Sequence, residues 1–111
     1  MLLGAHESVA GGLVKAIERA EADGCEALQI FVKSPNRWEG TELKAGDVAA
    51  FKKRARGFGI NSGQNIVTHA AYLINLASPK DDVRQKSIEA MKDEMRRCED
   101  LGVAYYVLHP G

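Results

Sequence analysis

The chain has 111 residues, of which 45% are hydrophobic and 27% charged, a composition that excludes disordered and fibrous proteins and allows one globular domain at most. Its 15 basic residues balance its 15 acidic residues, which excludes the broad basic field of many nucleic-acid-binding proteins, so any DNA-binding surface must be local. Short apolar runs broken by charges exclude a membrane-spanning helix, and the first residues lack the pattern of a signal peptide.

The first half of the chain alternates strand and helix signals. Residues 1–5 predict a short strand. The next segment predicts a helix that ends at Gly24, because apolar side chains recur there at helical spacing, namely Leu13, Ala16, Ile17 and Ala20. Residues 27–32 predict a second strand. A polar loop then leads to a helix that ends near Gly59 and carries the apolar stripe Val48, Phe51, Ala55 and Phe58.

A third helix has the clearest start signal in the sequence. We expect Ser78 as its N-cap, Pro79 at its first helical position and the carboxylate of Asp81 in its first turn. Gly102 ends this helix. Its expected buried face consists of Ile88, Met91, Met95, Cys98 and Leu101.

Two further strands complete the pattern. Residues 62–67 predict a weak strand, because Gly63 and nearby asparagines dilute it, and residues 104–108 predict a stronger one. Strand and helix thus alternate three times and end on a strand, which is typical of parallel α/β folds. A closed eight-stranded barrel needs roughly 250 residues. The chain therefore supplies about half a barrel and leaves its last strand unpaired.

All three histidines of the chain follow predicted strands: His6, His69 and His109. The carboxyl ends of parallel strands open on one face, so these imidazoles are expected to converge, and imidazole suits zinc. The alternative for each is an ordinary hydrogen bond to a neighbouring loop. No carboxylate is assigned to catalysis. The sequence also lacks a nucleophile elbow, a phosphate-binding glycine loop and a CxxC pair.

Several motifs together resemble one family, endonuclease IV (AP endonuclease family 2), from the first strand to the last residue. They are Gly4-Ala5-His6 with Ser8 and Gly11-Gly12-Leu13, Gln29-Ile30-Phe31, Asn36-Arg37-Trp38, His69-Ala70-Ala71-Tyr72-Leu73-Ile74-Asn75-Leu76, and His109-Pro110-Gly111. The resemblance implies a TIM barrel of the xylose isomerase-like type, with residues 1–111 as the amino-terminal half of a single endonuclease domain.

The resemblance also implies an activity. Members of the family bind three zinc ions and hydrolyse the phosphodiester bond 5′ to abasic sites in duplex DNA during base-excision repair, leaving a 3′-hydroxyl. His69 and His109 match two zinc-ligating histidines, and the remaining ligands are expected beyond residue 111. His6 is expected near the site, in a supporting or structural role. The intact enzyme is expected to act as a monomer and to have no membrane partner. The isolated 111 residues are expected to be inactive.

The DNA-contacting residues implied by the resemblance lie in two loops. Tyr72 and Leu73 match the side chains that fill the gap left by the displaced abasic nucleotide. Arg37 is a further expected DNA contact, although the family often places its inserting arginine two residues before the tryptophan, and here Arg37 directly precedes Trp38. The ordinary alternatives are core packing for Tyr72 and Leu73 and an exposed loop charge for Arg37.

Two rival functions remain. A metal-dependent sugar isomerase or epimerase of the xylose isomerase-like barrels also uses strand-end histidines, but it needs no DNA-inserting side chains. A non-catalytic DNA-binding module is the second rival. The expected compartment is the cytoplasm, because Cys25 and Cys98 occupy positions typical of buried, reduced cysteines.

Overall fold

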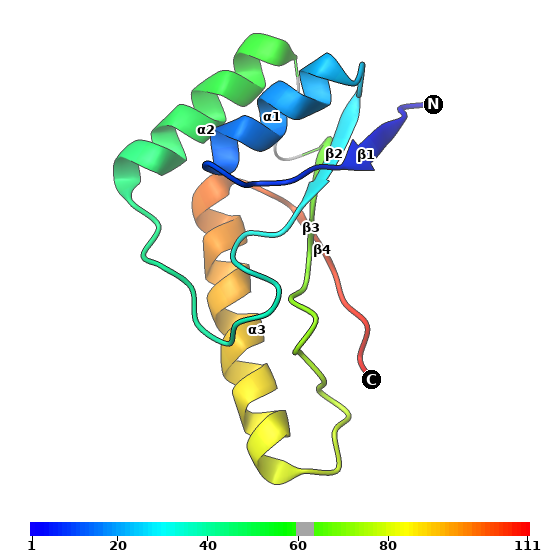
Figure 1. The fold of residues 1–111 in the computed structure, drawn as a ribbon, viewed down its shortest axis with the longest axis vertical. Helices are drawn as coiled ribbons and strands as arrows, with labels where there is room; N and C mark the ends of the chain where they lie inside the picture. Colours follow the sequence, from blue (N-terminus) through cyan, green and yellow to red (C-terminus); the bar gives the residue numbers. More distant parts are fainter. Residues whose placement is uncertain (60–63) are drawn as a thin grey trace.

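A computed structural model of the protein describes residues 1–59 and 64–111. Strands and helices alternate along the chain (Figure 1): β1 (Gly4–His6), α1 (Leu13–Ala22), β2 (Ala27–Ile30), α2 (Ala45–Phe58), β3 (Ile66–His69), α3 (Asp81–Leu101) and β4 (Tyr105–Val107). The strands form one sheet in the order β1-β2-β3-β4, and each neighbouring pair is parallel. The predicted α/β class is confirmed.

The strands are shorter than expected. β1 begins at Gly4, and the first three side chains, which were predicted to belong to the strand, are exposed. Gly4 faces Ala27 so closely that a Cβ there would overlap the Ala27 carbonyl, and this contact requires glycine. β3 extends to His69, two residues beyond its predicted end at Val67. Residues 62 and 63 of the predicted third strand lie outside the described residues.

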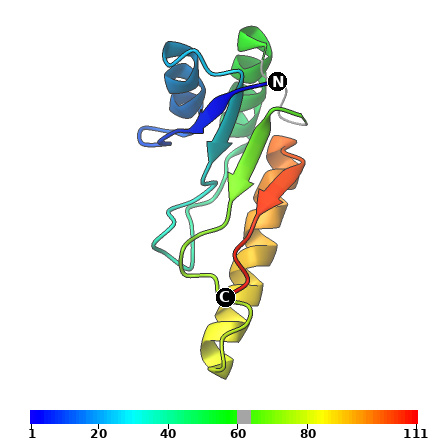
Figure 2. The same ribbon diagram turned by 90° about the vertical axis from the view of Figure 1, so that its right-hand side faces the viewer.

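The three helices lie on one face of the sheet (Figures 1 and 2). Strand side chains alternate in direction, and the register sets Leu28 beside Ile66 and Ile30 beside Thr68; all four are buried. Helix side chains close the apolar core over these strands: Ala16, Ile17, Ala20, Phe51, Ala55, Cys98 and Leu101. The predicted apolar faces of the first two helices are confirmed for the side chains that the structure describes. The Phe58 side chain is not among the described ones.

Glycines end the helices as predicted. α1 reaches its C-cap at Asp23, and Gly24 follows with a φ of 73°. Gly59 and Gly102 cap α2 and α3 in the same left-handed conformation, with φ of 86° and 73°. Residues with a Cβ adopt this conformation only at a cost, so glycine is the preferred stop.

The predicted start of α3 is wrong by two residues. The helix begins at Asp81 with Lys80 as N-cap, and the Lys80 carbonyl accepts the first helical bond from the Arg84 N–H at 3.0 Å. Ser78 instead closes the turn before the helix. Its hydroxyl accepts a hydrogen bond from the Lys80 N–H at 3.2 Å, and its carbonyl accepts one from the Arg84 guanidinium at 3.1 Å. The Ser78 side chain thus stabilises the turn before α3 instead of capping the helix.

The predicted buried face of α3 is also partly wrong. Met95 is 50% exposed, and Ile88 and Met91 are half-buried. The buried face combines the apolar residues Ala90, Cys98 and Leu101 with three polar ones, Ser87, Glu94 and Arg97. Loop backbone covers part of α3, and its N–H groups need acceptors, which Ser87 and Glu94 supply. Cys98 and Cys25 are buried, free thiols, as expected.

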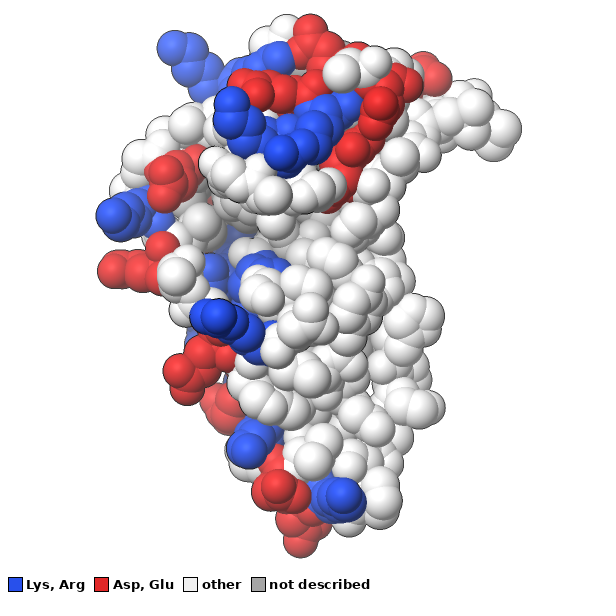
Figure 3. All heavy atoms as spheres, viewed as in Figure 1, with Lys and Arg blue, Asp and Glu red and all other residues white. Residues whose placement is uncertain are grey.

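Charged side chains of both signs gather over the helices, whereas the side of the molecule formed by β3, β4 and the segment after β3 is almost free of them (Figure 3). Among the described helices, none is long and apolar enough to cross a membrane.

Candidate metal and DNA site

Aromatic rings gather at the carboxyl ends of the strands. His6 ends β1, Phe31 follows β2, His69 ends β3 and His109 follows β4. The ring centroids of Phe31 lie 4.6 Å from His6, 5.6 Å from His69 and 5.2 Å from Tyr72. The His69 and His109 rings are 5.2 Å apart. The expected convergence of the three histidines is therefore present, with Phe31 in contact with His6 and His69, and His109 next to His69.

His69 presents one ring nitrogen for binding. Its Nδ1 lies 2.7 Å from the carbonyl oxygen of Ala70. A carbonyl only accepts, so Nδ1 carries the proton of this bond and Nε2 of the neutral ring keeps its lone pair. Metal-ligating histidines are oriented by such a bond. The neighbouring His109 ring is tilted by 42° relative to the His69 ring and is exposed.

His6 is tied to the sheet instead. Its Nδ1 accepts a hydrogen bond at 2.9 Å from the side-chain amide of Gln29, the residue paired with it on β2. Burial, and then the positive charge that His69 carries when protonated, lowers the pKa of His6. The ring is therefore neutral near pH 7. The supporting or structural role of His6 beside the other two histidines stays a prediction.

The segment after β3 projects an aromatic side chain. Tyr72 is 67% exposed and contacts Phe31 and His69 edge to face, so it does not pack in the core. Leu73 is half-buried beside it. The Tyr72 N–H donates to the Pro35 carbonyl at 2.9 Å, which joins this turn to the loop after β2.

Arg37 lies in that second loop and is exposed. The next residue, Trp38, is half-buried and packs against a small apolar cluster beneath the turn, consisting of Ala70, Ala71, Ile74 and Ala90. The two loops expected to contact DNA are thus neighbours in space. Their roles remain predictions, since position alone does not assign them.

Sequence reasoning missed three features of the site. Phe31 had a signal, because it follows β2 in the way the histidines follow their strands. Gln29 had no signal, since its contact with His6 depends on the register. The buried Lys33–Glu94 ion pair beneath the loops was detectable only in part: Glu94 shares a helix face with Ala90 and Leu101, at spacings typical of a buried stripe.

The described residues supply only part of a zinc site. Within residues 1–59 and 64–111, no group of three or more His, Cys, Asp or Glu side chains is arranged to hold a metal ion. His69 and His109 nevertheless fit as a pair of ligands, because their ring centroids are 5.2 Å apart and the Nδ1 bond of His69 leaves Nε2 available. A complete zinc site requires further ligands.

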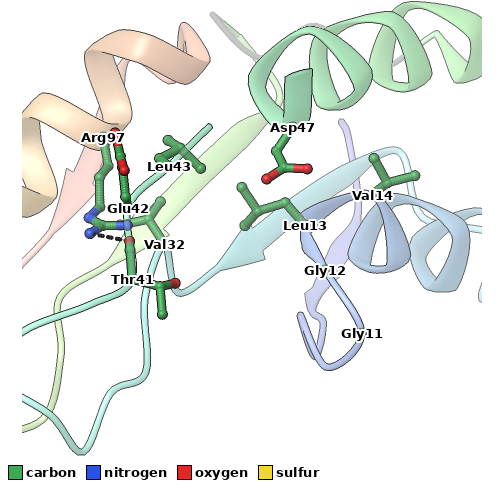
Figure 4. A pocket seen from close by; sticks show the side chains of 10 residues that line it. All are labelled: Gly11, Gly12, Leu13, Val14, Val32, Thr41, Glu42, Leu43, Asp47 and Arg97. Carbon is green, nitrogen blue, oxygen red and sulfur yellow. Dashed lines mark hydrogen bonds between the residues drawn. The ribbon is translucent and has the colours of Figure 1, made fainter. Parts of the chain in front are cut away.

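A separate cavity of about 310 Å³ lies between the N-terminal ends of α1 and α2 (Figure 4). Its lining includes Gly12, Leu13, Glu42, Asp47 and Arg97. The Arg97 guanidinium is already bonded to the Thr41 carbonyl at 2.7 Å. No histidine lines this cavity, so it is distinct from the candidate site.

Comparisons with known proteins identify the family of the chain. The xylose isomerase-like TIM barrel family matches residues 17–111. The chain is 46% identical over 109 residues to a probable endonuclease 4 of Trichlorobacter lovleyi, covering 98% of this chain and 38% of that protein. It is 44% identical over 108 residues to a probable endonuclease 4 of Chloroflexus aggregans, covering 97% of this chain and 37% of that protein.

A solved structure gives the same result. The crystal structure of endonuclease IV from Thermus thermophilus matches with a TM-score of 0.91 and 38% identity, covering 100% of this chain and 40% of that chain. The chain thus spans less than half the length of these relatives. Its four parallel strands and three helices correspond to the amino-terminal half of a barrel, as expected. The chain belongs to the xylose isomerase-like TIM barrel family and matches the amino-terminal part of the endonuclease IV proteins within it.

Proposed function

We propose that the protein at its full native length is a zinc-dependent endonuclease that hydrolyses the phosphodiester bond 5′ to abasic sites in duplex DNA, leaves a 3′-hydroxyl and serves base-excision repair. The observation that carries this proposal is the pairing of the His69 and His109 rings, 5.2 Å apart, beside the exposed Tyr72. The similarity to proteins named endonuclease 4 supports it. We place the enzyme in the cytoplasm, acting as a monomer.

His69 and His109 would hold zinc. When bound, zinc activates water and neutralises phosphate charge, which is the chemistry that phosphodiester hydrolysis requires. The protein contributes orientation: the Ala70 carbonyl fixes the His69 tautomer, and the β3 ladder fixes its backbone through pairing with Val107. We expect three ions in the full-length enzyme, with their other ligands outside these residues. The 111-residue chain alone is expected to be inactive.

The exposed loops would recognise the lesion. One loop carries the exposed Tyr72 and the half-buried Leu73, the other carries the exposed Arg37, and a backbone hydrogen bond joins the two loops. An abasic site lacks a base, so an aromatic or aliphatic side chain can enter the helical stack there at little cost. The near absence of charge around β3 and β4 (Figure 3) is compatible with recognition by insertion rather than by a basic field.

A sugar isomerase is the alternative, because strand-end imidazoles also suit a divalent metal and a sugar, and the family is described as xylose isomerase-like. Such an enzyme has no need of an exposed Tyr72 beside an exposed arginine. This pairing favours DNA as the substrate.

Measuring bound zinc tests the assignment of His69 and His109 as zinc ligands. We expect His69→Ala and His109→Ala to lower bound zinc in the dialysed full-length protein, measured by atomic emission, and to reduce cleavage of abasic duplex by more than about 100-fold, since losing even a ligand's supporting partner costs about 10–100-fold. His6→Ala is the comparison variant: His6 is bonded to Gln29 and is not assigned as a ligand, so this variant should lose less zinc than either of the other two. Full zinc content in both variants would contradict the assignment.

A further inference from the structure

A buried ion pair lies beneath the two loops of the site. The side chains of Lys33, after β2, and Glu94, in the middle of α3, are each 1% exposed, and their Nζ and Oε2 atoms are 3.3 Å apart. Two charges lose their hydration at such a position, which is costly unless each finds compensating partners. Their other contacts therefore indicate what the pair holds in place.

Glu94 binds the backbone next to Tyr72. Its Oε1 accepts hydrogen bonds from the Ala71 N–H at 3.0 Å and from the Tyr106 hydroxyl at 3.1 Å. Burial, and then the charge of Glu94, raises the pKa of Tyr106, so the phenol stays protonated and remains a donor. The other oxygen, Oε2, has no hydrogen bond within the described chain and is compensated by the Lys33 ammonium. Glu94 thus anchors the Tyr72 turn to α3 and β4.

Lys33 binds the backbone next to Arg37. Its Nζ donates to the Trp38 carbonyl at 2.7 Å and lies 3.8 Å from Asp93. Arg97 extends the same anchor, since it bonds Asp93 at 2.9 Å and the Thr41 carbonyl at 2.7 Å. The loop after β2 is therefore held against α3 by two cations, and α3 supplies two carboxylates, so the cluster is electrically neutral.

Lys33 and Glu94 form hydrogen bonds with the two loops, whereas the histidine His69 is held in another way. His69 is held by the sheet itself, through its pairing with Val107 and the bond from the Ala70 N–H to the Val107 carbonyl at 2.9 Å. The turn that begins at Ala71 lies beyond this ladder. It meets the other loop at the bond between Tyr72 and Pro35. The ion pair lies behind that junction, with one charge bonded to each loop.

We infer that Lys33 and Glu94 are positioning residues for lesion recognition: their ion pair holds the Arg37 loop and the Tyr72 turn at a fixed separation, so that both can engage a distorted duplex together. This inference rests on the proposed function. Placement within about 1 Å matters in such sites, because binding groups that are held in advance lose less entropy when they engage the ligand.

The test compares Lys33→Met, Glu94→Gln and the double variant in the full-length protein. Glu99→Gln is the control, because Glu99 lies on the same helix and is exposed. The measured quantity is the affinity for a duplex with one tetrahydrofuran abasic analogue and an uncleavable methylphosphonate 5′ to it, relative to the same duplex without the lesion. A 2-aminopurine opposite the lesion reports base unstacking. Zinc content and Tm are measured in parallel.

Each single variant should lower the preference for the lesion by about tenfold or more, because a misplacement of about 1 Å can cost that much or more. It should also weaken the 2-aminopurine signal and leave zinc content unchanged. Each should also lower Tm, because one buried charge loses its principal partner. The double variant removes both charges and should recover most of the Tm. It should not recover lesion preference, because the Trp38 carbonyl still lacks its donor. The control should change neither quantity.

Recovery of lesion preference together with Tm in the double variant would overturn the inference, since the role would then be purely structural. If the wild-type protein itself shows no preference for the lesion, the proposed function fails, and hydrogen exchange then decides on the ion pair. Faster exchange confined to residues 34–41 and 70–76 in Glu94→Gln supports the anchoring, and unchanged exchange there refutes it.

Discussion

The helix-covered core and the layer at the carboxyl ends of the strands are built by different physics. In the core, Ile17, Ile30, Phe51 and Ile66 are fully buried against one another. The carboxyl-end layer instead buries charges under its loops and leaves an aromatic side chain, Tyr72, exposed. Apolar burial is non-directional, so one apolar contact can replace another, whereas a buried charge needs a specific partner.

The difference separates stability from recognition. The core contains no residue of the candidate site, and the site rings contact one another at the edge of the sheet. Substitutions in the core should therefore change the free energy of unfolding, and substitutions in the exposed part of the other layer should change DNA binding.

The largest expected effect lies in the core. Phe51→Ala should lower the free energy of unfolding by about 3–5 kcal/mol, because Phe51 is completely buried and truncation leaves a cavity. Met95→Ala is the control; half of that side chain is exposed, and the change should stay within about 0.5 kcal/mol. Urea denaturation of both variants measures this. Equal losses would mean that α3 presents a different face to the sheet.

A smaller effect is expected at Tyr72. Removing its ring in Tyr72→Ala should weaken binding to abasic duplex by about 1–3 kcal/mol, the usual value of one stacked aromatic contact, with little change in Tm, because the side chain is mostly exposed. Tyr72→Phe keeps the ring and should bind like the wild type. Fluorescence anisotropy measures both. A fall in Tm without weaker binding would make Tyr72 a packing residue.

The smallest effect concerns Glu7, a buried carboxyl at the margin of the core, 3.9 Å from the Cys25 Sγ. A hydrogen bond with Asp23, then burial and the Asp23 charge, raises the pKa of Glu7. A raised pKa means that the stabilising contribution is present at acidic pH and is lost as pH rises through the folded-state value.

Glu7→Gln should therefore raise Tm slightly at neutral pH, and the gain should vanish in acid. Thermal melts of Glu7→Gln and of the exposed control Glu26→Gln across pH check this. A gain that persists in acid would contradict the assigned ionisation.

Much of the fold was predictable because local signals and tertiary packing agree. Alternating burial in β2 and β3 and the glycines after α1, α2 and α3 follow from side-chain periodicity and backbone freedom. The face of α3 was not predictable in full. Its orientation depends on loop N–H groups that require Glu94 and Ser87 as acceptors, so Met95 turns outward. Hydrophobic periodicity carries no information about this need for hydrogen-bond acceptors.

The same reasoning applies to the site. Convergence of His6, His69 and His109 follows from parallel strands, whose carboxyl ends share one edge. The contacts of Phe31 with His6 and His69, and the Lys33–Glu94 ion pair, join segments that are distant in the sequence. Spacing along the chain carries no information about such pairs.

Incision of a duplex oligonucleotide with one abasic site, by the zinc-loaded full-length protein with its product ends mapped, tests the central claim most directly. We predict cleavage 5′ to the lesion that leaves a 3′-hydroxyl and is lost on chelation and in His69→Ala. Failure of a zinc-replete protein to cut the abasic strand, or cleavage 3′ to the lesion, would contradict the account.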